Sequence, residues 1–397
     1  MPVGAELSKV ALRPPGTTTQ WLPLAAGLAA VALGAARLAQ DGSRPLLLWL
    51  IGVLLGLTLY HASFGFASGY RRMIVARDMR GVQAQQLLLA LTTLLFGPVL
   101  ASGSAFGQDV AGAWAPVGVS VAVGAFVFGI GMQLAGGCGS GALYTAGGGS
   151  LRMLMVLGAA CAGSFWASLH LGWWQELPAH DAIVLADTLG WPGAAGLQLL
   201  VIGVLATILR RFARPAPSAA APAQFAWRTV LSGPWPMVAD AALLALGNLW
   251  TLVVAGHPWS ITWGFTLWGA KGAMLAGWQP ASSGFWQGGW QYEVLAGSVL
   301  DDTTSMMDLA LMLGALCAAA LAGRFAPQWR VPWRSVAAAL LGGLAIGYGA
   351  RIAYGCNIGA FTSGAASGSL HGWLWIAAAL PGTWLGIGLR RRFGLPD

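Results

Sequence analysis

The sequence predicts an all-α polytopic membrane protein, built as an inverted repeat of two halves that each carry a cysteine in a glycine-rich helix break or re-entrant segment. Three observations lead to this fold class. Of the 397 residues, 57% are hydrophobic and only 9% are charged, whereas about 25% of a typical soluble protein is charged. Long uncharged runs separate small clusters of arginine, and one glycine- and cysteine-rich motif occurs twice.

The uncharged runs supply the expected membrane-spanning helices. One helix needs about 20 apolar residues to cross a bilayer, and the runs 110–151 and 352–389 are too long for a single crossing. We expect ten spans, near residues 20–40, 46–69, 82–102, 114–137, 151–172, 191–209, 236–256, 305–323, 334–354 and 370–389. The apolar segment 262–278 is left over. Both of its flanking connections fall on the outside, so it can enter the membrane and return, and the sequence leaves open whether it crosses.

Arginine clusters determine the predicted orientation. The net charge of +8 comes almost entirely from arginines between apolar runs, which is the pattern of cytoplasmic loops rather than of a nucleic-acid-binding surface. Placing every cluster inside puts both termini in the cytoplasm. The predicted parts are a first transmembrane half (1–210), a cytoplasmic Pro/Ala linker (211–228) and a second transmembrane half (229–397).

The two halves share a motif at an offset of 218 residues. GIGMQLAGGCGSGA (Gly129–Ala142) and GYGARIAYGCNIGA (Gly347–Ala360) have seven identities in fourteen positions, with Cys138 aligned to Cys356. By the arginine count, the span before Cys138 runs from outside to inside, and the span before Cys356 runs the other way. Repeats of opposite orientation are a common transporter design.

Each motif predicts a break in a helix beside a thiol. A glycine inside a helix costs about 1 kcal/mol relative to alanine, and a broken helix in a membrane must satisfy its backbone against protein or a water-filled cavity. If a short helix begins after each cysteine, its first N–H groups attract anions. The predicted substrate-binding residues of the breaks are Cys138, Cys356, Gly137, Gly139, Ser140, Gly141, Gly355, Asn357 and Gly359.

The alternative is that the glycines only permit close helix packing and that both cysteines are small core residues. Cys161 and Cys317 lie in the middle of ordinary spans and are interpreted as packing residues. No cysteine pair has metal-ligand spacing, and no nucleotide-binding loop is found, so we predict no metal, no cofactor and no direct use of ATP.

Two charged side chains complete the predicted substrate-binding set, because ionisable residues inside membranes are candidates for function. Lys271 lies in the segment 262–278. Arg351 lies five residues before Cys356, where it could neutralise an anion in transit or extend to the inner membrane surface.

Three segments resemble the YeeE/YedE family, which is associated with sulphur transport. They are FGFASGYRRMIVARDMRG (Phe64–Gly81), GMQLAGGCGSGALYTAGGGS (Gly131–Ser150) and GYGARIAYGCNIGAFTSGAASGSLHGWLW (Gly347–Trp375). The resemblance implies a bacterial inner-membrane protein of inverted repeats that takes up thiosulfate or a related sulfur anion. It also implies that the thiols of Cys138 and Cys356 line the path and hold the anion by weak S–H contacts. Thiosulfate-importing members have a further cysteine in the first segment, where this sequence has Gly65.

The leading hypothesis is therefore a transporter of thiosulfate or a related sulfur anion in the lipid bilayer, with a small cytosolic sulfur-carrier protein as a possible partner. A second hypothesis is a membrane sulfur- or selenium-transfer protein in which a cysteine becomes a persulfide. An enzyme of that kind needs a base beside its nucleophile, and no His, Asp or Glu lies within five residues of either cysteine. We therefore predict that the protein is not an enzyme. A third hypothesis is an accessory subunit of a membrane complex, which would not need the repeated thiols.

Overall fold

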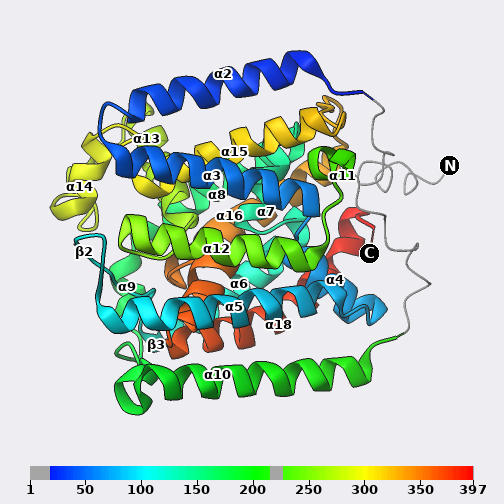
Figure 1. The fold of residues 1–397 in the computed structure, drawn as a ribbon. Coiled ribbons are helices and arrows are strands. Elements are labelled where there is room, and N and C mark those ends of the chain that lie inside the picture. Colours follow the sequence, from blue (N-terminus) through cyan, green and yellow to red (C-terminus); the bar gives the residue numbers. More distant parts are fainter. Residues whose placement is uncertain (1–17, 215–226, 397) are drawn as a thin grey trace.

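The computed structural model describes residues 18–214 and 227–396 and is almost entirely helical (Figure 1). Within these residues, ten stretches are long and apolar enough to cross a membrane, and they fall at the ten positions predicted from the sequence. The helices up to residue 214 are α2 (Trp21–Leu38), α3 (Ser43–Ala62), α4 (Phe66–Ala76), α5 (Arg80–Ser102), α6 (Val119–Ala135), α7 (Gly139–Gly147), α8 (Leu151–Ser168), α9 (Leu171–Gln175) and α10 (Leu185–Phe212).

The second described range, 227–396, contains the remaining helices. Its elements are α11 (Trp227–Ser232), α12 (Met237–Ala255), α13 (Thr262–Leu275), η1 (Pro280–Ser282), α14 (Gly289–Ala296), α15 (Thr303–Leu321), α16 (Trp333–Ile352), η2 (Asn357–Ser363), α17 (Gly364–Ala366), α18 (Leu370–Arg390) and η3 (Arg391–Phe393).

Four two-residue strands tie the connections together at one end of the bundle. β1 (Ser104–Ala105) and β2 (Gln108–Asp109) form a hairpin, and β3 (Val117–Gly118) pairs antiparallel with β4 (Ala179–His180). Phe106 and Gly107, in the hairpin turn, both have positive φ angles, as a two-residue type I′ turn requires.

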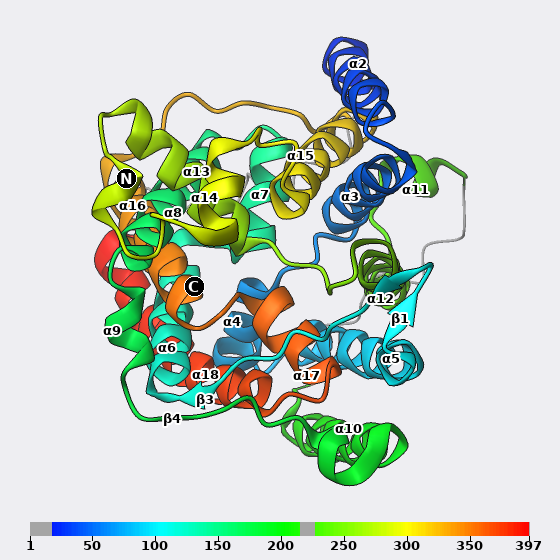
Figure 2. The same ribbon diagram turned by 90° about the vertical axis from the view of Figure 1, so that its left-hand side faces the viewer.

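The helices pack in matching pairs. α6 packs against α18 while α8 packs against α16, and α3 packs against α15 while α12 packs against α5. The outermost helices also correspond, because α2 lies on α15 and α10 lies on α5. Figures 1 and 2 show α2 and α10 at opposite edges of the bundle.

Glycines four residues apart permit the closest of these contacts. A Cβ atom added at Gly343 or Gly347 of α16 would collide with backbone atoms of α8, and one added at Gly382 or Gly386 of α18 would collide with backbone atoms of α6. Membrane helices attract one another mainly through close van der Waals packing, and small residues bring their backbones together. The glycine content of the sequence is therefore partly a packing feature, as the alternative interpretation of the motifs allowed.

The long segment predicted at 46–69 is not one helix. α3 ends at Ala62, Ser63 adopts a left-handed φ of 51°, and α4 begins at Phe66. The chain stays apolar across this break, so its hydropathy does not show that the helix ends and restarts here. The leftover segment 262–278 forms α13, whose 14 residues extend about 21 Å at 1.5 Å per residue. That is less than the roughly 30 Å of a bilayer core.

The two ends of the bundle carry different connections. α4, α11 and the C-terminus lie at the right-hand end of Figure 1, and β2, α9 and α14 lie at the left-hand end. Two expectations fall on residues outside the described ranges: the location of the N-terminus (1–17) and most of the predicted linker (215–226). α10 continues through Phe212, and α11 begins at Trp227, so the ends of that linker are helical.

Candidate functional site

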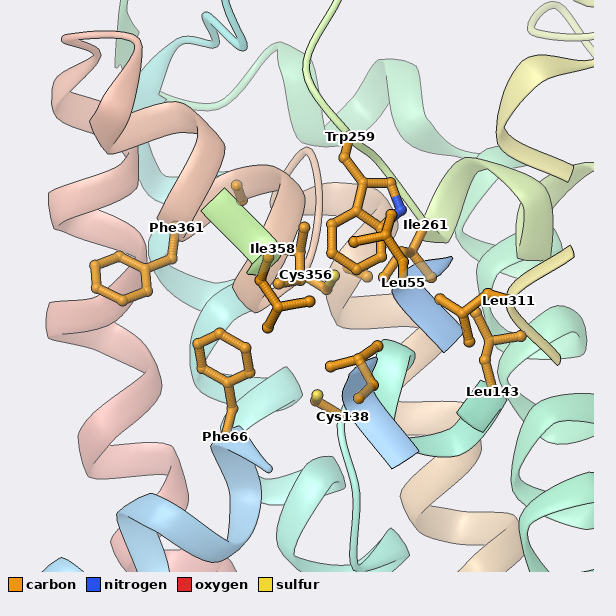
Figure 3. Packing of buried hydrophobic residues seen from close by; sticks show 14 of the residues in the cluster. Leu55, Phe66, Cys138, Leu143, Trp259, Ile261, Leu311, Cys356, Ile358 and Phe361 are labelled. Carbon is orange, nitrogen blue, oxygen red and sulfur yellow. The ribbon is translucent and has the colours of Figure 1, made fainter. Parts of the chain in front are cut away.

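Four short helical segments begin near the middle of the bundle instead of crossing it. They are α4, α7, α13 and the continuous pair η2–α17, and each follows a longer helix after three to six non-helical residues. Figure 3 shows side chains from the start of each segment around one centre: Phe66, Cys138, Ile261, Cys356 and Ile358. All five are buried and belong to one apolar cluster. The first N–H groups of each segment are unpaired within it and carry partial positive charge.

Backbone geometry enforces the second break. Gly355 has a φ of 150°, and a Cβ atom placed there would come within 2.8 Å of the Ala360 amide nitrogen. Only glycine adopts this conformation without strain. At the first break, Gly136 ends α6 with a φ of 83°. Cys138 and Cys356 themselves are extended and occupy the N-cap positions of α7 and η2.

The Cys138 thiol lies among backbone amides. Its side chain is buried, with a relative exposure of 1%, and Sγ lies 3.4 Å from Oγ of Ser140. The amides of Gly141, in α7, and Phe66, at the start of α4, face the sulfur. Neighbouring Gly139 lies against Ile261 and Thr262 at the start of α13. The first break therefore contacts two of the other three segments.

The Cys356 thiol has a similar environment at the start of η2. It is also 1% exposed, and the amides of Ile358 and Gly359 face its sulfur. Cys138 and Cys356 lie in the same buried apolar cluster (Figure 3). Gly359 lies against Ser260, just before α13. The structure thus brings the two cysteines of the repeated motif to one site, although 218 residues separate them in the sequence.

The remaining predicted residues of the breaks are at the same place. Gly137, Gly139, Ser140, Gly141, Gly355, Asn357 and Gly359 are all buried in the two breaks. Asn357 is the first residue of η2, and its side chain makes no hydrogen bond within the described part of the chain.

Sequence reasoning missed two features of this site. Asn248 of α12 accepts a hydrogen bond from the Trp259 amide at 2.9 Å and donates one to Ser363 Oγ at 3.0 Å. These bonds connect the loop before α13 to η2. Tyr70 of α4 is buried beside Asn357. The only sequence signals were single polar residues in apolar runs, which do not reveal a partner in a distant segment.

Lys271 lies away from the two breaks. Its ammonium group donates hydrogen bonds to the carbonyl oxygens of Leu295 at 2.8 Å and Gly297 at 2.7 Å, so it caps the C-terminal end of α14. It is nine residues into α13, about 14 Å along the helix axis from the site.

Arg351 lies at the end of α16, and its guanidinium carbon is 5.6 Å from the centre of the Trp263 ring and 5.2 Å from that of Phe285. Trp263 also lines an open pocket of about 490 Å³, together with Asp302 and Ser260. Ser260, which lines this pocket, also lies next to Gly359 of the second break. The Trp263 ring therefore lies between the Arg351 guanidinium group and the pocket.

Cys161 and Cys317 lie inside α8 and α15, away from the breaks. The Cys317 sulfur faces Gly27 of α2, and the Cys161 carbonyl faces Gly269 of α13. All four cysteines are free thiols. The described residues contain no group of three or more His, Cys, Asp and Glu side chains that could hold a metal ion.

Comparison with known proteins gives a family and several relatives. The family model described as sulphur transport matches residues 61–385. The chain is 28% identical over 352 residues to the thiosulfate transporter TsuA of Spirochaeta thermophila, covering 84% of this chain and 96% of the relative. It is 24% identical over 367 residues to the thiosulfate transporter TsuA of Escherichia coli, covering 84% and 91%.

Another relative has a higher sequence identity to this chain over a shorter aligned region. The probable transporter YedE of Escherichia coli is 33% identical over 164 residues, which cover 41% of this chain and 38% of that relative. The aligned part of the chain thus spans less than half the length of the YedE relative. The family model covers most of the described helices, including both cysteine breaks. On this basis the chain is a multi-pass membrane protein that belongs to the sulphur transport family.

Proposed function

We propose that the protein takes up a small sulfur-containing anion, most specifically thiosulfate, across the bacterial inner membrane along a path between Cys138 and Cys356. The observation that carries the proposal is the meeting of two buried thiols at the starts of converging helical segments. Backbone N–H groups at such termini favour negative charge. The thiols are weak hydrogen-bond donors and polarizable contacts for a sulfur atom.

The mechanism consists of transient contacts without covalent turnover. An anion that arrives from the side of Ser260 contacts Cys356 first. It then moves to Cys138, which lies in the same buried cluster as Cys356. The apolar side chains of Phe66, Ile261 and Ile358 surround this step. They exclude water, so the amide and thiol contacts act in a low-dielectric environment.

An inverted repeat accounts for the paired packing. Exchanging the two halves converts the α6–α18 contact into α16–α8, the α3–α15 contact into α12–α5, and the α2–α15 contact into α10–α5. Because this exchange pairs α2 with α10, we place the boundary between the two halves before α10 and not in the linker 211–228. The arginine clusters, together with α4, α11 and the C-terminus, lie on the cytoplasmic face, where a small sulfur-carrier protein would accept the cargo.

Transport by purified protein in liposomes tests this function. Proteoliposomes should accumulate radiolabelled thiosulfate, and unlabelled thiosulfate should compete more strongly than sulfate, which has no terminal sulfur for the thiols. Mass spectrometry of the recovered protein should show unmodified cysteines. A stable persulfide on Cys138 or Cys356, with no uptake, would favour the sulfur-transfer hypothesis instead.

A further inference from the structure

Two buried polar side chains at the site have no hydrogen-bond partner within the described residues. The Tyr70 hydroxyl belongs to a side chain that is 3% exposed, and the Asn357 amide belongs to one that is 0% exposed. Buried polar groups are nearly always hydrogen-bonded, and an unpaired one needs an explanation. Desolvating such groups without a partner costs free energy. Both groups therefore have hydrogen-bonding capacity that a ligand at the site can satisfy.

The position of the two groups relates them to the proposed path. Asn357 directly follows Cys356 and begins η2. Tyr70 lies one helical turn after Phe66, whose amide faces the Cys138 sulfur. The Asn357 side chain lies next to the Tyr70 hydroxyl without forming a bond of acceptable geometry. Tyr70 and both motif cysteines belong to the same buried cluster. Tyr70 and Asn357 therefore bring together α4, which lies beside Cys138, and η2, which begins after Cys356.

The chemistry of the pair differs from that of the thiols. A phenol O–H and an amide NH₂ are good donors to oxygen, whereas a thiol is a weak donor. Both the phenol and the amide are uncharged, so they can bind an oxyanion while buried without the desolvation cost of a lysine. A ligand that satisfies both parts of the site has oxygen atoms at one end and sulfur at the other.

We infer that Tyr70 and Asn357 form an oxyanion subsite, which holds the oxygen atoms of the transported anion while its terminal sulfur contacts a cysteine thiol. This inference rests on the proposed function and makes it more specific. The subsite selects anions that carry oxygen on sulfur, such as thiosulfate, over oxygen-free species such as hydrosulfide. Hydrosulfide would leave the phenol and the amide unpaired, and a site built for hydrogen bonds rejects ligands that lack the matching groups.

Binding measurements on purified protein in detergent test the inference. The Tyr70→Phe variant removes one hydroxyl and keeps the ring, and Asn357→Asp replaces a donor with a group that repels anions. Tyr60→Phe is the matched control, because Tyr60 is a partly buried tyrosine of a membrane helix outside the four short segments. We expect Tyr70→Phe to weaken thiosulfate binding about tenfold, Asn357→Asp to weaken it more, and Tyr60→Phe to leave it unchanged.

A second ligand separates a subsite from a structural role. Competition by hydrosulfide should be unchanged in Tyr70→Phe, so that the ratio of thiosulfate to hydrosulfide affinity falls about tenfold. If both affinities fall equally, or if only the thermal stability without ligand changes, Tyr70 is structural and the inference is wrong. If the wild-type protein binds thiosulfate and Tyr70→Phe binds it equally well, the inference fails while the proposed function stands. If the wild type binds no thiosulfate, the proposed function itself fails.

Discussion

The break at Cys138 begins a regular α-helix in which glycine and serine follow the cysteine, whereas the break at Cys356 begins a π-helical turn in which asparagine follows it. Backbone amides face both sulfurs, and the first sulfur also has a side-chain hydroxyl at 3.4 Å. The second break also adjoins the open pocket through Ser260. One sequence motif thus gives two different local structures. The shared part is the thiol at the helix start, and the residues that follow it differ.

The largest expected effect tests what the two breaks share. Cys138→Ala and Cys356→Ala should each reduce thiosulfate uptake by at least about tenfold, equivalent to about 1.4 kcal/mol, because each removes one thiol from the path. Uptake into proteoliposomes measures this.

Cys161→Ala and Cys317→Ala are the matched controls, since they remove the same atoms from ordinary helix interiors. Thermal unfolding should show all four variants folded, because a thiol fills little volume compared with a large core side chain. Equal transport by all four would mean that both motif cysteines serve packing only.

The next effect tests how strongly each break depends on the backbone conformation of its glycine. Gly355→Ala should lower the free energy of unfolding by about 3 kcal/mol, the upper end for a residue held in a disallowed backbone region, because its Cβ also meets backbone atoms of Ala360. Gly136→Ala should cost about 1 kcal/mol for a left-handed conformation, since its Cβ meets only the end of the Arg152 side chain and that of Met153. Thermal or denaturant unfolding in detergent compares them. A larger loss at Gly136 would reverse the proposed difference in backbone constraint.

A smaller effect concerns access from the pocket. A membrane-impermeant thiol reagent applied to the face that carries the pocket should modify Cys356 faster than Cys138, because the pocket reaches Ser260 beside Gly359. The rates are compared in Cys138→Ala and Cys356→Ala single variants by mass spectrometry, in a background where Cys161 and Cys317 are serine. Faster modification of Cys138 from that face would contradict the proposed route.

The smallest effect concerns the hydroxyl that only the first break has. Ser140→Ala should change uptake by about twofold, or about 0.4 kcal/mol, because the Ser140–Cys138 contact involves a weak sulfur partner. Ser140→Cys supplies a second thiol of similar size and should retain most of the uptake. A tenfold loss in Ser140→Ala would make this serine a direct ligand and not only a neighbour of Cys138.

The sequence was sufficient to predict the spans, because long uncharged runs leave few other structures in a membrane. It also identified both cysteine motifs, since their spacing and glycines recur in register. It did not predict the break between α3 and α4, where Ser63 takes the left-handed conformation without a change in hydropathy. Lys271 illustrates a second limit. An isolated charge in an apolar run suggests a function, but carbonyl groups 24 and 26 residues later bind it. Tyr70 and Asn357 meet only through the fold, and no local pattern connects them.

The four helical segments that begin at the centre supply positive potential through peptide N–H groups. Peptide groups do not titrate in the range where proteins remain folded, and they cannot be acetylated or otherwise neutralised as a lysine can. A membrane protein that used a buried lysine here would lose its attraction for anions whenever that lysine gave up its proton. In this fold the attraction is a property of the backbone itself, so it is present as soon as the chain is folded and is insensitive to the acidity on either side of the membrane.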